Sequence, residues 1–185
     1  MPQPAQVSVK LSIPLFGEIN GVWEPDDAER RAAWELYVEL ITRVTVVDLR
    51  PDEGLMREAL ASVYTLFGST REILRRYGPE VAPRRAPGRL SFGAIAVAVL
   101  NGTLRPFLAR WHPALTSDEA TLPEGGDPVA HERAWEHADE LRRELDQVRS
   151  SLTDLAQLLA EVAGVAHFHD GATDDGDQTR PDTDD

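Results

Sequence analysis

The sequence contains no cysteine, and this absence excludes disulfide bonds and thiol chemistry. Lysine is nearly missing too, because Lys10 is the single lysine among 19 basic residues and the rest are arginine. The segment Met1–Lys10 has no basic region followed by a long apolar run, so no export signal is predicted. The longest apolar stretch, Phe92–Leu100, is much shorter than the roughly 20 residues that span a bilayer. These absences predict a cytoplasmic protein with no membrane association.

Motifs for catalysis, metals and cofactors are also lacking. The histidines are His112, His131, His137, His167 and His169. His131 and His137 are six residues apart and do not share a helix face, and the Glu-x-x-His motif of di-iron helical bundles does not occur. His167 and His169 form one close pair, which is a weak metal signal, and no glycine-rich phosphate loop is present. We therefore predict a protein that is not an enzyme, with no catalytic residues, no metal site and no cofactor.

Positive charge is scarce overall, but it is concentrated in one region. The net charge is −13, and residues 170–185 contribute −6 of it through seven aspartates and one arginine. In contrast, residues 71–89 hold six arginines and two glutamates, which gives +4. Because phosphate neutralisation supplies most nucleic-acid affinity, the acidic balance argues against a nucleic-acid partner. Arg71, Arg75 and Arg76, in the last turn of the second predicted helix, either complement the helix dipole and cover the helix end or form a docking patch for an acidic partner.

The most regular pattern is a run of apolar residues between positions 134 and 162, at steps that alternate between four and three. Its members are Ala134, Ala138, Leu141, Leu145, Val148, Leu152, Leu155, Leu159 and Val162. This heptad seam predicts one long helix that must be covered by neighbouring helices. Asp127-Pro128 predicts its start and Gly164 its end. Because the other predicted helices are shorter, we expect part of the seam to extend beyond them and to be open to a second chain.

The N-terminal half predicts a strand and two helices. Apolar and polar residues alternate over residues 7–13, which predicts a strand that ends at Pro14, and Asn20-Gly21 predicts a turn. A first helix is predicted to begin near Pro25. Residues 44–47 are β-branched and fit either a frayed helix end or a short strand. A second helix is predicted from Pro51 or Asp52 to the stop signal Gly78-Pro79.

A third helix is predicted from Ser91 to His112, where Pro113 should end it. Its first half is apolar on nearly all sides and should be the most buried helix. Pro106 lacks an amide donor and crowds the carbonyl of Gly102, so a kink or short break is predicted between these residues. Such a break either bends a packing helix or frames a binding site. Residues 116–126 are polar and are predicted to form a surface loop.

Together these patterns predict a mainly α fold, namely an up-and-down four-helix bundle with a long C-terminal helix and a short N-terminal β-strand or hairpin. Residues 1–24 would form the strand and turn segment packed on the bundle, and residues 25–166 the bundle itself. Residues 167–185 would be a disordered acidic tail.

The segments Phe67–Tyr77 and Leu100–Leu115 resemble segments of uncharacterised bacterial helical proteins, some of them associated with conflict or defence loci. The resemblance implies a bacterial accessory or scaffold protein. It brings no catalytic motif and no residue role to this chain.

Two functional hypotheses follow. The first is a non-enzymatic interaction or scaffold protein that self-associates as a homodimer or docks on a larger protein partner through exposed seam or the end of the third helix. Its predicted contact residues are Arg75, Arg76, Arg105, Trp111 and His112. The alternative is a bundle that binds a small molecule or metal in a pocket at the kinked third helix. That pocket is predicted at Asn101, Gly102 and Pro106.

Overall fold

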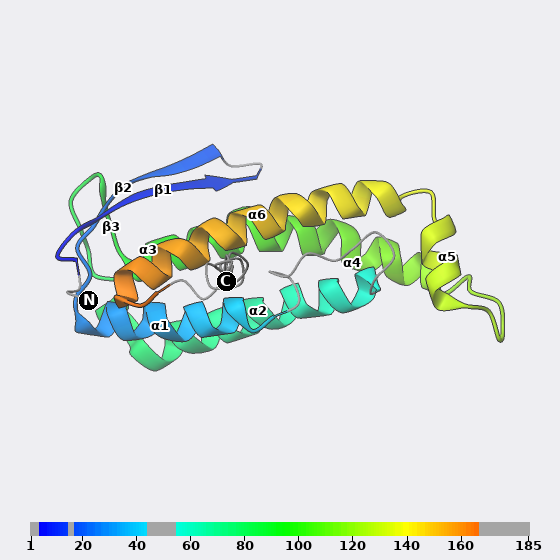
Figure 1. Ribbon diagram of the computed structural model, residues 1–185, viewed down its shortest axis with the longest axis horizontal. Coiled ribbons are helices and arrows are strands. Elements are labelled where there is room, and N and C mark those ends of the chain that lie inside the picture. The colour runs from blue at the N-terminus through cyan, green and yellow to red at the C-terminus, as the bar shows by residue number, and fades with distance from the viewer. Residues whose placement is uncertain (1–3, 15–16, 44–54, 167–185) are drawn as a thin grey trace, which may run out of the picture.

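The computed structural model describes residues 4–14, 17–43 and 55–166, and in these ranges the chain is mainly helical with a small three-stranded sheet (Figure 1). In chain order the elements are β1 (Val7–Ile13), β2 (Gly17–Trp23), α1 (Asp27–Ile41), α2 (Met56–Tyr77), the 3-10 turn η2 (Gly78–Val81), β3 (Arg89–Leu90), α3 (Phe92–Val99), the π-helical turn η3 (Leu100–Leu104), α4 (Arg105–Glu119), α5 (Pro128–Ala134) and α6 (Ala138–Ala163). The acidic segment 167–185 lies outside the described residues.

The sheet contains the predicted N-terminal strand and two further strands. β1 and β2 are antiparallel, with Val7 opposite Trp23, and β3 pairs with β2 in parallel. The apolar residues of β1 alternate with exposed polar residues and are buried on the side that contacts α6. The predicted turn at Asn20-Gly21 is wrong, because both residues lie within β2. A Cβ at Gly21 would lie 2.8 Å from the Gly88 carbonyl oxygen, so this strand position requires glycine for a close approach of two backbones.

The ends of α1 and α2 follow from local sequence. Asp26 caps α1, and its carboxylate accepts a hydrogen bond of 2.9 Å from the Glu29 amide, while the Glu29 side chain accepts one of 3.1 Å from the Asp26 amide. α2 ends at Tyr77, where Gly78 has a positive φ of 62°, as the stop signal predicted. The predicted start of this helix and the β-branched residues 44–47 lie outside the described residues.

The third helical run is longer than predicted, because α3, η3 and α4 continue without a gap to Glu119. Pro113 lies inside α4 and does not end it. The Pro113 ring opposes the carbonyl of Ala109, an exposed residue, so water can satisfy the hydrogen bond that the proline removes. Part of the predicted loop 116–126 is therefore helical.

The predicted kink or break between Gly102 and Pro106 is a π-helical turn instead. Within it the Arg105 amide bonds to the Leu100 carbonyl, five residues back. A π-turn places one extra residue in the helix and widens the hydrogen-bonding pattern just before a proline that has no amide to donate. The helix therefore passes Pro106 without ending.

The prediction of one helix from Pro128 to Ala163 is wrong. The chain leaves the helical conformation at Trp135, which has φ −65° and ψ 131°, and α6 begins at Ala138. The Trp135 ring packs edge-on against Trp111, with 6.0 Å between centroids, and against His137 at 5.4 Å. Tertiary contacts of this kind outweigh the helical pattern of the sequence.

From Ala138 to Val162 every residue of the heptad seam is at most 5% exposed. The α6 helix contacts α1, α4 and β1, and these elements cover the seam within one chain. The prediction that part of the seam extends beyond its neighbours is therefore wrong, and the seam offers no docking face.

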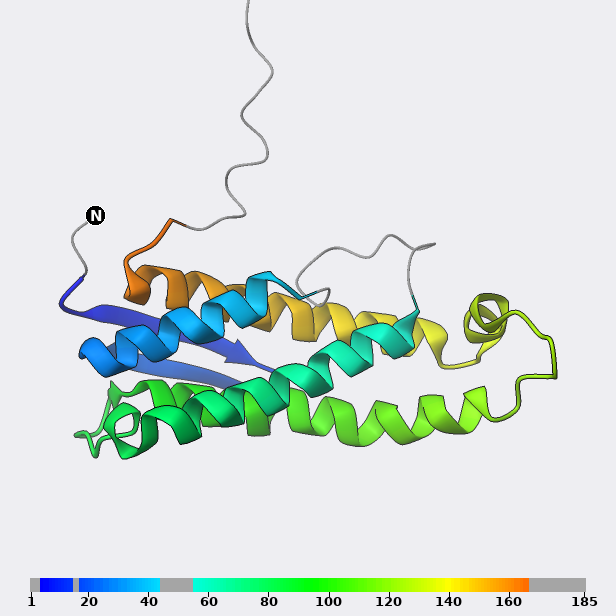
Figure 2. The ribbon, with the colours of Figure 1, turned by 90° about the horizontal axis from the view of Figure 1, so that it is seen from below.

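The long helices lie side by side. α1 contacts α6 and α2, and α4 contacts α2 and α6, so that α2 lies next to the α3–α4 run (Figures 1 and 2). By length and composition, Phe92–Glu119 could cross a membrane, but 56% of its most apolar window is buried in the protein, which is also usual for a core helix. The α2–α4 contact leaves an open groove on the outside of the molecule.

Candidate functional site: the groove between α2 and α4

The described histidines do not converge on a metal site. His112 lies on α4, His131 approaches the Asp118 carboxylate at 3.4 Å, and His137 packs in the aromatic cluster beside Trp135. Within residues 4–14, 17–43 and 55–166, no group of three or more His, Asp or Glu side chains could hold a metal ion. His167 and His169 lie outside these ranges.

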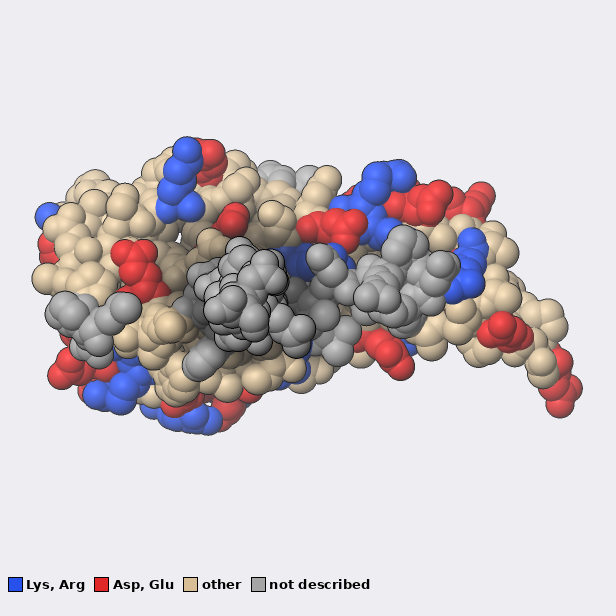
Figure 3. Space-filling model, viewed as in Figure 1, with Lys and Arg blue, Asp and Glu red and all other residues tan. Residues whose placement is uncertain are grey.

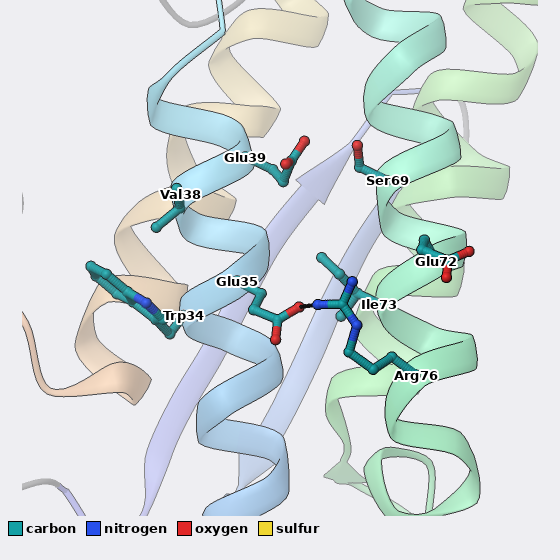
Figure 4. A pocket seen from close by; sticks show the side chains of 8 residues that line it. All are labelled: Trp34, Glu35, Val38, Glu39, Ser69, Glu72, Ile73 and Arg76. Carbon is teal, nitrogen blue, oxygen red and sulfur yellow. Dashed lines mark hydrogen bonds and ion pairs between the residues drawn. The ribbon is translucent and has the colours of Figure 1, made fainter.

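A first hollow lies between α1 and α2 and is lined by both polar and apolar side chains (Figure 4). It has a volume of about 350 Å³ and is lined by Trp34, Glu35, Val38, Glu39, Ser69, Glu72, Ile73 and Arg76. Arg76 forms an ion pair with Glu35, and the Tyr77 hydroxyl donates a hydrogen bond of 2.7 Å to the same carboxylate. Arg43 pairs with Glu39. The contacts of Arg76 and Tyr77 with Glu35 cross between the helices, and Arg43 adds a hydrogen bond of 3.0 Å to the Ser69 hydroxyl, so these contacts tie α1 to α2.

The same contacts shift the pKa of Glu39, which lines this hollow, and of Tyr77, which lies next to Arg76 in the chain. Burial raises the pKa of Tyr77 above its ordinary value, and the hydrogen bond to Glu35 raises it further. Burial also favours a higher pKa for Glu39, but hydrogen bonds with Arg43 and Ser69 outweigh this effect and lower the pKa. Tyr77 therefore stays protonated and Glu39 ionised over a wide pH range, which is the state in which both bonds stabilise the fold.

A second hollow, which we call the α2–α4 groove, is larger and less polar. Its volume is about 540 Å³, and it is lined by Tyr64, Phe67, Arg105, Leu108, Ala109 and His112. Tyr64 is 66% exposed, the highest value among the large apolar side chains that the structure describes as exposed. Its ring lies 6.3 Å from the His112 ring across the groove. An aromatic side chain left this open favours a contact with another molecule.

One end of the α2–α4 groove is closed by a polar bridge. Arg57 on α2 donates two hydrogen bonds to the Glu119 carboxylate on α4, the one from its Nε at 2.8 Å, and a third to the Thr116 hydroxyl at 3.1 Å. This bridge joins the two helices, and its arginine neutralises the Glu119 carboxylate. None of the residues that line the groove is acidic.

Three arginines follow this side of the molecule. Arg71 and Arg75 come seven and eleven residues after Tyr64, so they share its side of α2, and Arg105 lies in the groove itself. The Arg105 guanidinium carbon lies 5.6 Å from the centre of the Phe67 ring. All three are exposed, and none forms an ion pair within the part of the chain that the structure describes.

The predicted contact residues do not form one surface. Arg105 and His112 meet in the α2–α4 groove, and Arg75 shares the outer side of α2 with Tyr64. Arg76 is turned to the other side of α2, where it pairs with Glu35 (Figure 4). The prediction of a surface anchor at Trp111 is wrong, since this residue is 2% exposed.

Trp111 is held inside by its own partners. Its indole nitrogen donates a hydrogen bond of 2.6 Å to Glu144, and the Arg110 guanidinium lies 4.5 Å from its ring centre. A seven-residue step separates it from Leu104, which is also buried, and this periodicity marks the inner face of the helix. The seven-residue spacing from the apolar Leu104 could have predicted that Trp111 is buried.

The alternative pocket residues surround the π-turn but do not enclose one cavity. Asn101 is exposed and Gly102 is buried, while Pro106 lines a small hollow of about 120 Å³ on the α6 side of the helix. Its other lining residues are Pro14, Thr103, Phe107, Arg110, Glu144, Gln147 and Val148. The Thr103 hydroxyl is buried and makes no hydrogen bond among the described residues.

Sequence reasoning missed Tyr64, Phe67 and Leu108 as site residues. On α2, Tyr64 lies just outside the apolar stripe, next to the buried Val63. The sequence signal for a surface site was the position of Tyr64 beside the apolar stripe, three residues before Phe67. This signal could not show which helix lies opposite.

On the surface drawn in Figure 3, acidic and basic side chains alternate over the described residues, without a broad area of one sign. No protein-family model, curated protein or solved structure matches the chain. The function must therefore be argued from the geometry of the chain itself.

Proposed function

We propose that this chain is a non-enzymatic interaction protein that docks on a partner, or on a second copy of itself, through the α2–α4 groove. The observation that carries the proposal is Tyr64, an aromatic side chain that is 66% exposed beside Phe67 and Leu108 in a hollow of about 540 Å³. Burying aromatic surface in a preformed groove is a common source of binding energy in protein interfaces.

The scaffold that we infer is an up-and-down four-helix bundle made of α1, α2, the α3–α4 run and α6. The contacts of α1 with α2 and α6, and of α4 with the same two helices, support this interpretation. A bundle of this kind holds neighbouring antiparallel helices rigidly side by side, so the groove between α2 and α4 would be present before a partner arrives. Preformed sites lose less entropy on binding.

The polar groups of the groove favour binding over catalysis. No hydrogen bond joins the His112 ring to a carboxylate in the described ranges, so the arrangement that would make this histidine a general base is not formed there. The arginines and the phenol of Tyr64 are suited to orient a partner.

An affinity-capture experiment from the native cell tests the proposal. The full-length chain is compared with Ala109→Arg, which fills the groove, and with Ala130→Arg, a matched control at an exposed position on α5. We expect the wild type and Ala130→Arg to retain a partner, or to self-associate in light scattering, and Ala109→Arg to lose it. A strict monomer with the same captured proteins for all three chains would leave the proposal without support.

A second candidate function is supported by the buried Thr103 hydroxyl. In a regular α-helix this hydroxyl could bond to the carbonyl four residues back, but in the π-turn it makes no hydrogen bond among the described residues. Arg110, Glu144 and Gln147 line the same small hollow, so a small polar molecule would find complementary groups there. Thermal-shift measurements with amino acids, carboxylates and polyols, on wild type and Thr103→Val, test this. Identical melting temperatures throughout would argue against it.

A further inference from the structure

We propose that the occupant of the α2–α4 groove is an acidic amphipathic helix of a partner protein. This inference rests on the function proposed above and adds the chemistry of the partner. It is argued from the shape of the groove, from the spacing of its apolar residues and from the charge of its rim.

The shape of the site suits a helix. The groove runs between two adjacent helices, α2 and α4, which is the setting in which an incoming amphipathic helix lays its apolar face. On α4, Arg105, Ala109 and His112 lie about one turn apart, and on α2 Tyr64 and Phe67 are three residues apart. Beyond the groove lining, the same side of α2 continues to Arg75, about 16 Å from Tyr64 along the helix axis, which corresponds to roughly three turns of a bound helix.

The positive charge of Arg71, Arg75 and Arg105 on the groove side of the molecule favours an acidic helix over a neutral or basic one. Arg43, Arg57, Arg76, Arg85, Arg89 and Arg110 are all paired with carboxylates of the same chain. Among the described residues Arg71, Arg75 and Arg105 form no ion pair; Arg31, Arg84, Arg142 and Arg143 form none either, but Arg71, Arg75 and Arg105 share the side of the molecule on which the groove lies. Three arginines left together beside an apolar groove are complementary to a partner that carries carboxylates along the edges of its apolar face.

The contact of Arg105 with Phe67 prepares this arginine for such a partner. Stacking on the ring holds the guanidinium near the groove without using its hydrogen-bond donors. A carboxylate of the incoming helix could then accept a bidentate pair of hydrogen bonds. Nucleic acid fits the site less well, because a chain of net charge −13 repels a phosphate backbone, and that backbone would leave Tyr64 uncovered.

The test uses a displayed library of 20-residue amphipathic helices. Apolar positions vary among Leu, Ile and Phe at spacings of three and four, and the flanking positions vary between Glu, Gln and Lys. We expect the full-length protein to enrich helices with Glu at the flanks, and Ala109→Arg to abolish their binding. A synthetic peptide of the most enriched sequence is then titrated by fluorescence anisotropy.

Two variants with the same net charge distinguish ion pairs between the peptide and the groove arginines from a general effect of net charge on binding. The Arg71→Glu/Arg105→Glu variant should weaken binding of the acidic peptide by about tenfold or more. Arg31→Glu/Arg143→Glu changes the net charge by the same amount at exposed positions of α1 and α6 and should bind within about twofold of wild type. Equal weakening by both variants would overturn the proposed pairing.

Other outcomes would overturn the proposal in distinguishable ways. Enrichment of neutral or basic helices that still depends on Ala109 would reject the acidic partner but keep the groove as a docking site. If the affinity for the peptide rises about tenfold when the seven aspartates of residues 170–185 are changed to Asn, the groove is assigned to the chain's own acidic segment.

A dimer that Arg71→Glu/Arg105→Glu breaks would assign the groove to a second copy of the chain. If no helix depends on the groove, the inference fails, and the capture experiment above still decides whether the groove docks a protein at all.

Discussion

Two buried glutamates act at helix ends that belong to other parts of the chain. Glu29 is fully buried in α1, pairs with Arg85 at 2.6 Å and accepts a hydrogen bond of 3.0 Å from the Phe92 amide at the start of α3. Glu132 is 6% exposed, and both of its carboxylate oxygens lie 3.0 Å from the Met56 amide at the start of α2. The N-terminus of a helix favours negative charge, so both carboxylates stabilise a junction between distant segments.

We predict that Glu132→Ala lowers the free energy of unfolding by about 1–3 kcal/mol, because α2 has no side-chain cap of its own and the Met56 amide would lose its acceptor. Urea denaturation measures the loss, and hydrogen exchange at Met56 should become faster. Glu136→Ala serves as the control, since that side chain is 83% exposed, and it should stay within about 0.5 kcal/mol of wild type. Equal losses from both variants would contradict the capping role.

At the scale of elements, the α3–η3–α4 run shows how a helix accommodates a proline. The π-turn from Leu100 to Leu104 adds one residue ahead of Pro106, and the helix then continues with Phe107, Trp111 and Leu115 on its buried face. A π-turn of this kind is equivalent to a single-residue insertion into an α-helix. The inserted residue should therefore be removable if the proline is removed with it.

We predict that deleting Asn101 together with Pro106→Ala yields an uninterrupted α-helix and changes the free energy of unfolding by no more than about 1 kcal/mol. The matched control deletes Ala109 with the same Pro106→Ala change. That deletion should rotate all later residues of α4 by roughly 100° and move Trp111 and Leu115 out of the core. Far-UV circular dichroism in urea compares the two chains. A deletion of Asn101 as damaging as that of Ala109 would contradict this view of the π-turn.

At the scale of the whole molecule, the sheet and the helices share one core. The inner face of β1 packs on α6, and Trp23 at the end of β2 is fully buried, with its ring 6.4 Å from Phe92 in α3. Arg30 in α1 ties the same region together, because it donates hydrogen bonds to the Val162 carbonyl at 2.6 Å and to the Pro4 carbonyl at 2.5 Å. The N-terminal strands therefore have little apolar surface to bury without the helices.

We predict a single cooperative unfolding transition in which the sheet and the helices are lost together. Leu11→Ala on β1, where the leucine is 3% exposed, should cost about 2–5 kcal/mol and lower the midpoint of the helical signal and of the tryptophan fluorescence equally. Ser12→Ala, at an exposed position of the same strand, is the control. A separate early transition that affects tryptophan fluorescence alone would show that the strands unfold independently.

Features that depend on local periodicity and on helix stop signals could be predicted from the amino-acid sequence. The alternation of β1, the glycine stop at Gly78 and the buried apolar residues of α6 all follow from spacings within one segment. Of the candidate site, Arg105 and His112 were named from their place near the end of the third helix. Local patterns predict these features because each pattern depends only on the geometry of a single helix or strand.

Which helices are neighbours depends on the packing of the whole chain and could not be predicted from local patterns. The packing of Trp135 on Trp111 interrupts a helical pattern that the sequence carries without a break, and it buries the tryptophan that looked like a surface anchor. Tyr64 belongs to the groove because α4 lies opposite it. The physical reason is that contacts between distant segments depend on how whole elements pack, and helical periodicity contains no information about the partner of each face.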